Sequence, residues 1–419
     1  MKIIQLLARV EGAGVTRYTI ELGNAMKELG HEVEVIYVKA HDKPEMVARK
    51  QNFENITEYD YSDETVKHIN EADLVIINSI ISKKADEKYK TAWYDMVQNK
   101  ITTKKVIVLN DHKASGTASY YGTIYKNEDF WLSFDHICTF SPTGEVPMMI
   151  KRFMKDENEF TKRYIHLLHP YKFDDTHNTW QKFSDKKRRV TYLGSQSLIK
   201  DPMRILRGRE HFYRHNYELE YRGIMRTINM ATQPDLIYSW DENGNKGPSK
   251  ACIWADDKKW RLANNIALDD NMIDTERQKN WIYIFGEFIR EEGLYVVSKS
   301  AFGCNFFNLK NPINCGDNLE YSIFEMIDRG TIPLLDYDTA NNVYLYVNGE
   351  KTNKTLYDLG LGVFLKMDLS NAEECMQQMD KLMNDENAYN EMRNKLFDYY
   401  KQHCDPLANT KKFIEDCMS

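Results

Sequence analysis

Three acidic residues in one short stretch, Asp317, Glu320 and Glu325, are the first candidates for a chemical role in this sequence. Glu325 follows Asp317 by a little over two helical turns, so the two carboxylates lie on roughly one face of a helix. Carboxylates on the first turns of a helix can accept hydrogen bonds from sugar hydroxyls, while helix-end N–H groups hold a phosphate. The alternative is an ordinary bias of acidic residues toward a helix N-terminus.

A glycine-containing turn near the N-terminus is a candidate phosphate or sugar site. Gly12 and Gly14 follow an apolar run and precede Val15, where helical periodicity starts, so helix amides face the turn. A single G-x-G is as often a tight turn as an anion site. The full G-x-G-x-x-G fingerprint is absent, which argues against NAD.

A second turn runs from Gly194 and Ser195 to Lys200, with Arg204 and Arg207 beyond it. A glycine at a strand end, followed by cations near a helix start, suits a diphosphate because amides and cations neutralise it together. The alternative is a solvated basic surface helix. The position at the end of a strand favours the anion site.

Asp111 and His112 directly follow the apolar run Val106–Leu109. Ligands of open α/β sheets bind beyond the carboxyl ends of the strands. An Asp-His pair at such an end can take part in proton transfer or sugar binding. A capping Asp beside a surface His explains the same pair equally well.

The elements that must position these residues alternate between strand and helix, which predicts an α/β fold. Strands are predicted at Lys2–Ala8, Glu32–Val38, Leu74–Ile77, Val106–Leu109, His136–Phe140, Val190–Leu193, Trp281–Phe285 and Ile332–Leu335. Helices are predicted at Val15–Leu29, in the stretch that Gly330 ends, and at Ala372–Met383, Glu386–Gln402 and Lys411–Met418. Residues 173–184 lack apolar periodicity and are predicted to link two β/α units.

Composition sets limits on the class of protein. The 419 residues are enough for two or three domains, and the formal net charge of −7 gives no overall basic character for nucleic acid. The clusters Lys186–Arg189 and Arg204–Arg209 still allow a local basic cleft. Seven scattered cysteines without metal-ligand spacing predict a reduced, cytoplasmic protein with no metal. No signal peptide or membrane span is recognised in the N-terminal sequence.

The combination of these features resembles the GT-B glycosyltransferases, which have two Rossmann-like β/α domains facing a central cleft. The stretch around Glu325 resembles the E-x7-E element of the retaining families, with Asp317 in the place of the first Glu. More narrowly, the chain resembles the bacteriophage DNA α-glucosyltransferases that modify 5-hydroxymethylcytosine. The matching stretches are ARVEGAGVTRY, LGHEVEVIYVK, ADLVIINS, SKSAFG and NLEYSIFEMIDRGTIP.

The resemblance implies two domains with different roles. Residues 1–170 become an acceptor-side domain, residues 171–404 a nucleotide-sugar-binding domain, and residues 405–419 a helix that packs back on the first. The implied donor-binding residues are Gly12, Gly14, Val15, Gly194, Ser195, Lys200, Arg204, Gly223, Phe302, Gly303, Glu320, Tyr321 and Glu325. The implied catalytic residues are Asp111, His112 and Lys200. Ser195 stands where such families commonly carry Arg, so Arg204 or Arg207 is expected to supply that charge.

The implied reaction is transfer of a sugar from a UDP-sugar to the hydroxymethyl group of 5-hydroxymethylcytosine in double-stranded phage DNA. Retention is expected, with no cofactor, metal or membrane, in a monomer working in the cytoplasm of the infected host cell. A front-face route, in which the leaving phosphate takes the acceptor proton, needs no protein nucleophile. The alternatives are a GT-B enzyme with a polysaccharide, lipid or small-molecule acceptor, and a DNA- or nucleotide-sugar-binding module without catalysis.

Overall fold

The structure is a computed structural model of the 419-residue chain. It describes residues 1–8, 14–40, 56–81, 85–109, 124–141, 144–194, 201, 203–222, 238–240, 246–248, 252–254, 282–285, 290–306 and 319–419.

A parallel sheet of seven described strands forms the N-terminal unit, in the order β3-β2-β1-β4-β5-β6-β7. The strands are β1 Lys2–Leu7, β2 Glu32–Val38, β3 Ile56–Tyr59, β4 Leu74–Asn78, β5 Lys105–Leu109, β6 His136–Thr139 and β7 Tyr164–His166. The helices are α1 Gly14–Glu28, α2 Asp63–Asn70, α3 Glu87–Asp95, α4 Glu128–Leu132, α5 Glu145–Phe153 and α6 Glu157–Arg163.

A second parallel sheet of seven described strands forms the C-terminal unit, in the order β12-β13-β9-β8-β14-β15-β18. The strands are β8 Lys187–Leu193, β9 Glu218–Arg222, β12 Cys252–Trp254, β13 Ile282–Phe285, β14 Ser300–Cys304, β15 Ile332–Asp336 and β18 Val363–Leu365. Two antiparallel pairs accompany it, β10 Tyr238–Trp240 with β11 Lys246–Pro248 and β16 Tyr344–Val347 with β17 Glu350–Thr355. Its helices are α7 Met203–Arg207, α8 Arg209–Arg214, α12 Arg290–Lys299, α13 Tyr321–Asp328, α14 Tyr337–Asn342, α15 Ala372–Met383 and α16 Glu386–His403.

Each unit is built from apolar strands whose two faces are covered by helices. The interior strands β4 and β15 are buried along their whole length, as expected of parallel strands covered on both sides. The side chains that face away from solvent gather into one cluster around the second sheet and two around the first. The chain passes from the first sheet to the second between His166 and Lys187.

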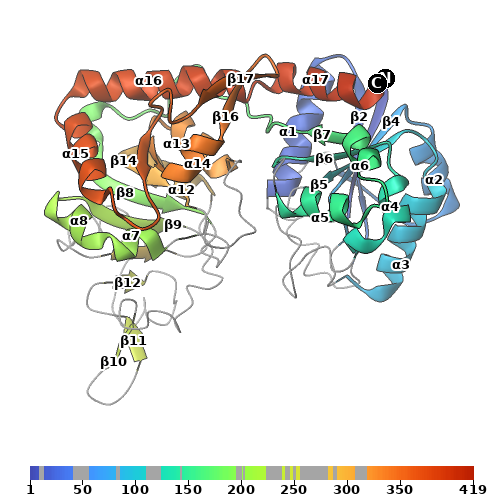
Figure 1. Ribbon diagram of the computed structural model, residues 1–419, viewed down its shortest axis with the longest axis horizontal. Coiled ribbons are helices and arrows are strands. Elements are labelled where there is room, and N and C mark those ends of the chain that lie inside the picture. The colour runs from blue at the N-terminus through green and yellow to red at the C-terminus, as the bar shows by residue number, and fades with distance from the viewer. Residues whose placement is uncertain are drawn as a thin grey trace.

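The last helix, α17 (Pro406–Met418), leaves the C-terminal unit and returns to the N-terminal one, as Figure 1 shows in red. Phe413, Ile414 and Cys417 of this helix share a core cluster with Ile3 of β1 and Leu22 of α1. The fold is therefore GT-B, two Rossmann-like units with a crossing C-terminal helix. The assignment of one unit to the acceptor and the other to the donor stays a prediction.

Candidate functional site

Glu320 lies just before α13 and is held by the end of strand β14. It is the N-cap residue of α13, yet its side chain makes no cap hydrogen bond. Instead, Asn305 Nδ2 donates to Glu320 Oε2 at 2.9 Å, and Tyr192 Oη donates to Asn305 Oδ1 at 3.4 Å. Because Asn305 follows β14 and Tyr192 lies near the end of β8, this chain of hydrogen bonds holds Glu320 over the carboxyl ends of two central strands.

Glu325 lies one turn further along α13 and faces the other unit. Arg17, on the first turns of α1, donates from Nη1 to Glu325 Oε1. Only 12% of the Glu325 side chain and 22% of the Arg17 side chain are exposed. This ion pair joins the helix that follows the predicted G-x-G turn to the helix that carries the predicted sugar-binding carboxylates. The two groups of candidate residues therefore meet.

Two neighbouring tyrosine rings pack against the Arg17 guanidinium. Its central carbon lies 4.7 Å from the centre of the Tyr321 ring and 5.0 Å from that of Tyr171. Burial alone lowers the pKa of Arg17, but Glu325 and the other neighbours outweigh burial, so the pKa is raised and the guanidinium stays charged. Sequence reasoning missed Arg17, although a cation in the first turn after a glycine loop is a recognisable sign.

The C-terminal end of α13 is fixed by the segment that links the two sheets. Tyr171 Oη donates to Asp328 Oδ2 at 3.2 Å, and the Asp174 N–H donates to Asp328 Oδ1 at 2.8 Å. Trp180 Nε1 donates to the Asp328 carbonyl at 3.0 Å. Gly330 then ends the helix with φ +64°, and a Cβ there would come 2.8 Å from the Trp180 ring. The position therefore requires glycine, as predicted from the helix end.

The predicted diphosphate turn begins and ends at the carboxyl edge of the second sheet. Gly194 follows β8 with φ +139°, a conformation that favours glycine. On the far side of the turn, the Asp201 N–H donates to the Phe306 carbonyl, just beyond β14, at 2.9 Å. Gly194 and Asp201 therefore lie at the same edge of the sheet as Asn305 and Glu320.

On the N-terminal side, buried amides join the carboxyl ends of the central strands to α1. Asn78 Nδ2 at the end of β4 donates to Gln5 Oε1 at 3.2 Å, and Gln5 Nε2 donates to the Thr19 carbonyl at 2.8 Å. Gln5, a fully buried polar residue within an apolar strand, sets the position of α1 against β1. The sequence offered this sign, since one amide interrupts the run KIIQLL, but it was not used.

Several predicted site residues lie outside the described residues, namely Gly12, Asp111, His112, Ser195, Lys200 and Gly223, together with Asp317. Among the others, Gly14 and Val15 open α1, and Tyr321 and Glu325 both meet Arg17.

Three predicted donor-binding residues are buried in the second unit. The Arg204 side chain is fully buried and forms ion pairs with Asp201 and Asp336. Phe302 is fully buried in β14, with its ring centre 5.8 Å from that of Tyr217. Gly303 lies in the same strand beneath a helix. Donor binding by these three residues stays a prediction, although the Arg204 guanidinium is already paired with carboxylates.

The two predicted basic clusters are also largely neutralised. Arg189 is buried and pairs with Glu220 at 3.1 Å, while burial lowers the pKa of Lys186 well below its usual value. Arg188 is paired with Asp380 and Arg207 with Asp201. These side chains brace the second sheet, so the structure does not support a nucleic-acid surface made from them.

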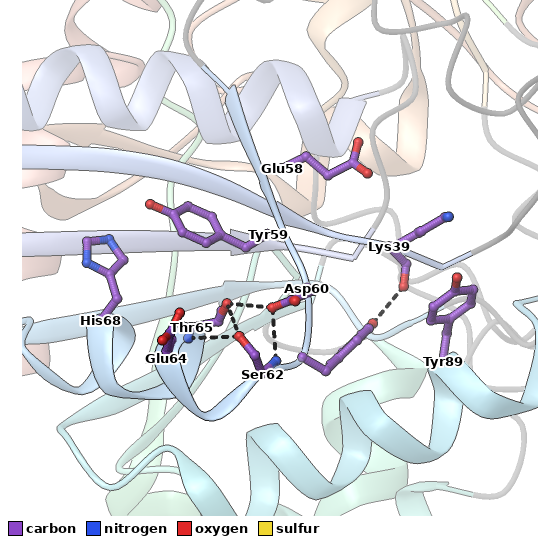
Figure 2. A pocket seen from close by; sticks show the side chains of 10 residues that line it. Lys39, Glu58, Tyr59, Asp60, Ser62, Glu64, Thr65, His68 and Tyr89 are labelled. Carbon is purple, nitrogen blue, oxygen red and sulfur yellow. Dashed lines mark hydrogen bonds between the residues drawn. The ribbon is translucent and has the colours of Figure 1, made fainter.

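A cavity of about 830 Å³ lies beside the edge strand β3, away from the facing helices α1 and α13. Figure 2 shows its lining, which mixes carboxylates, tyrosines and cations, namely Lys39, Glu58, Tyr59, Asp60, Tyr61, Ser62, Glu64, Thr65, His68 and Tyr89. Tyr59 stacks on His68, whose Nε2 lies 2.7 Å from Glu34 Oε2. No predicted site residue lines this cavity, and Asp60, Ser62 and Thr65 in its lining bind one another.

Within the described ranges, no group of three or more His, Cys, Asp or Glu side chains is placed to hold a metal ion. None of the described helices is both long enough and apolar enough to cross a membrane.

Comparison with known proteins gives one consistent result. A profile of the DNA alpha-glucosyltransferase family matches residues 13–386. The DNA alpha-glucosyltransferase of Enterobacteria phage T4 is 23% identical over 420 residues, which cover 97% of this chain and 96% of that protein. A solved alpha-glucosyltransferase in complex with UDP and a 13-mer DNA containing a HMU base superimposes with a TM-score of 0.75, 19% identity and full coverage of both chains. Another, in complex with UDP-glucose and DNA containing an abasic site, gives 0.74 and 18%, covering 100% of this chain and 99% of that one.

Proposed function

This chain belongs to the DNA alpha-glucosyltransferase family, and we propose that it transfers glucose from UDP-glucose to the hydroxymethyl group of 5-hydroxymethylcytosine in double-stranded DNA. Relatives of the same family support both substrates, since one solved structure holds UDP-glucose with DNA and another holds UDP with DNA. Glucose is α-linked in UDP-glucose, so an alpha product means that the anomeric configuration is retained.

The observation that carries the proposal is the meeting of α1 and α13 at the Arg17–Glu325 ion pair. It brings the start of a helix in one sheet unit to the acidic helix of the other, at the edge where α/β proteins bind ligands. In this position Glu325 accepts hydrogen bonds from the hydroxyls of the nucleotide ribose. Glu320, held by Asn305, accepts hydrogen bonds from the transferred sugar.

The diphosphate lies on the turn that begins at Gly194, with Lys200 as its cation. Breaking the bond between the sugar C1 and the UDP oxygen leaves negative charge on the departing phosphate. Lys200 and backbone N–H groups stabilise that charge in the transition state more than in the ground state.

The acceptor oxygen forms the new bond to C1 from the same face that the diphosphate leaves. Its proton passes to the leaving phosphate, which balances the reaction without a covalent enzyme intermediate. Asp111 and His112, which follow β5, orient the acceptor hydroxyl. The 5-hydroxymethyl group projects into the major groove, so the hydroxyl is reachable in a duplex, and base flipping would improve access. We place this reaction in the cytoplasm of the infected host cell, carried out by a monomer.

Sugar transfer to defined DNA tests the proposal. The protein is incubated with a panel of UDP-sugars and duplexes that contain either cytosine or 5-hydroxymethylcytosine, and the digested nucleosides are weighed by mass spectrometry. A gain of one hexose with UDP-glucose, only on the hydroxymethylated duplex, is the expected result. Turnover of UDP-glucose without any gain on DNA would point to another acceptor and contradict the proposal.

A further inference from the structure

The Arg17–Glu325 ion pair links two parts of the chain that are far apart in the sequence. Arg17 belongs to the first sheet unit, and Glu325 to the second. Arg17 Nε also lies 3.8 Å from Glu21 Oε1 on the same helix, and this contact helps to orient the guanidinium along α1. An exposed ion pair contributes little, whereas this one is largely shielded from solvent and stacked on aromatic rings. The pair is thus built into the structure rather than formed by chance at a surface.

We propose that Arg17 is a positioning residue for the donor. It fixes the Glu325 carboxylate in the orientation that receives the ribose hydroxyls. The inference rests on the ribose role given to Glu325 above. Arg17 binds Oε1, and a carboxylate can accept about four hydrogen bonds. The ion pair can therefore persist while the carboxylate binds the donor.

The surroundings of Arg17 support positioning over direct contact with phosphate. Its guanidinium is paired with Glu325 and packs against the neighbouring Tyr321 and Tyr171 rings. Tyr321 Oη in turn donates to the Pro170 carbonyl at 3.3 Å, and Tyr171 is anchored to Asp328. Pro170 and Tyr171, in the segment that links the two sheets, therefore help to fix the position of the Arg17 guanidinium. Arginine suits this position because its planar group both stacks and donates in a fixed direction.

A consequence follows for the relation between the two units. Glu325 is oriented from across the boundary, so its carboxylate is correctly held only while α1 and α13 face each other. Donor affinity then depends on the arrangement of the two units, and a bound ribose stabilises that arrangement in return.

Binding of UDP, measured by calorimetry, tests the inference. Arg17→Met should weaken UDP binding about tenfold, the lower range for loss of a charged hydrogen bond. Arg17→Lys keeps the charge but lacks the planar group, so its affinity for UDP should lie between that of the wild type and that of Arg17→Met. Lys27→Met, an exposed cation on the same helix, should bind UDP like the wild type.

The deciding measurement uses a UDP analogue that lacks both ribose hydroxyls. If Arg17 acts through the Glu325–ribose contact, Arg17→Met and the wild type bind this analogue equally, and Arg17→Met combined with Glu325→Gln binds UDP no more weakly than Glu325→Gln alone. Turnover on hydroxymethylated DNA should show a raised KM for UDP-glucose with kcat near that of the wild type, because ribose binding is equal in ground and transition states.

Three results would overturn the inference. Wild-type affinity of Arg17→Met for UDP would show that the ion pair does not position the ribose ligand. An equal loss of affinity for UDP and for the analogue would assign Arg17 a general structural role. Unchanged UDP binding by Glu325→Gln would instead remove the ribose role of Glu325 itself, and with it the basis of the inference. Thermal unfolding of each variant shows whether it is folded.

Discussion

Acid should destabilise this protein through one buried histidine, His403, at the end of α16. The side chain is buried, and its Nδ1 accepts a hydrogen bond from the Tyr346 N–H at 3.2 Å. Burial, with a smaller contribution from nearby His166, lowers the pKa of His403 from 6.5 to about 4. A proton on Nδ1 would put two donors face to face.

The direction and size of the effect follow from this shift. Between pH 6.5 and pH 4 the unfolded chain binds a proton at this residue that the folded protein does not, so stability falls as pH is lowered. A shift of this size corresponds to about 3 kcal/mol of unfolding free energy. This contribution is fully present above pH 6.5 and is lost when the pH has fallen to about 4.

Urea unfolding at several pH values measures the effect. His403→Asn is the matched control, because its Oδ1 can accept from the Tyr346 N–H and does not titrate. Carboxylates titrate alike in both proteins, so the comparison isolates the histidine. The wild type should lose about 3 kcal/mol more than the variant between pH 7 and pH 4. Parallel stability curves would refute the argument.

Three further substitutions test other parts of the structure. Arg204→Met leaves the buried Asp336 without its cation, while Asp201 keeps Arg207, and should lower the free energy of unfolding by about 3–5 kcal/mol; in urea unfolding, a loss below that of the exposed control Arg214→Met would contradict it. Gly330→Ala forces a Cβ against Trp180 at positive φ and should cost about 1–3 kcal/mol, whereas an unchanged melting temperature would show that the helix end adapts. Lys200→Ala should sharply lower kcat with UDP-glucose while the melting temperature is unchanged, and near wild-type turnover would end its assignment to the diphosphate.

Local patterns in the sequence were sufficient for much of the fold. Strand β2 has the predicted bounds Glu32–Val38, and helix α15 the predicted bounds Ala372–Met383. In both elements the apolar residues recur at a regular spacing, and this pattern lies entirely within the element's own sequence. The predicted helix before Gly330 is also present, because a glycine at positive φ ends it.

Contacts between distant segments could not be predicted from the sequence. The basic run Lys186–Arg189 was considered part of a possible basic cleft, but a neighbouring strand supplies Glu218 and Glu220 to neutralise Arg189. Arg204 likewise pairs with Asp336, which is 132 residues away in the chain. Charge in a sequence does not reveal which carboxylate the fold brings to it.

The candidate site shows the same division. Glu320, Tyr321 and Glu325 were proposed together because they share one helix start, whereas Arg17, which is 308 residues from Glu325 in the chain, was not proposed. Phe302 and Gly303 were assigned through a matching stretch, and that stretch is the buried strand β14. Resemblance thus pointed to elements that meet at the edge of the second sheet, and the ligand-binding role of each residue there stays a prediction.

The anomeric configuration of the product decides whether the proposed transfer to DNA takes place. Duplex DNA with 5-hydroxymethylcytosine is treated with the protein and UDP-glucose, the modified nucleoside is isolated, and the coupling between the sugar H1 and H2 is measured by NMR. We expect glucose on the hydroxymethyl oxygen, with the small H1–H2 coupling of an α linkage. The large coupling of a β linkage, or no glucose on the nucleoside, would contradict it.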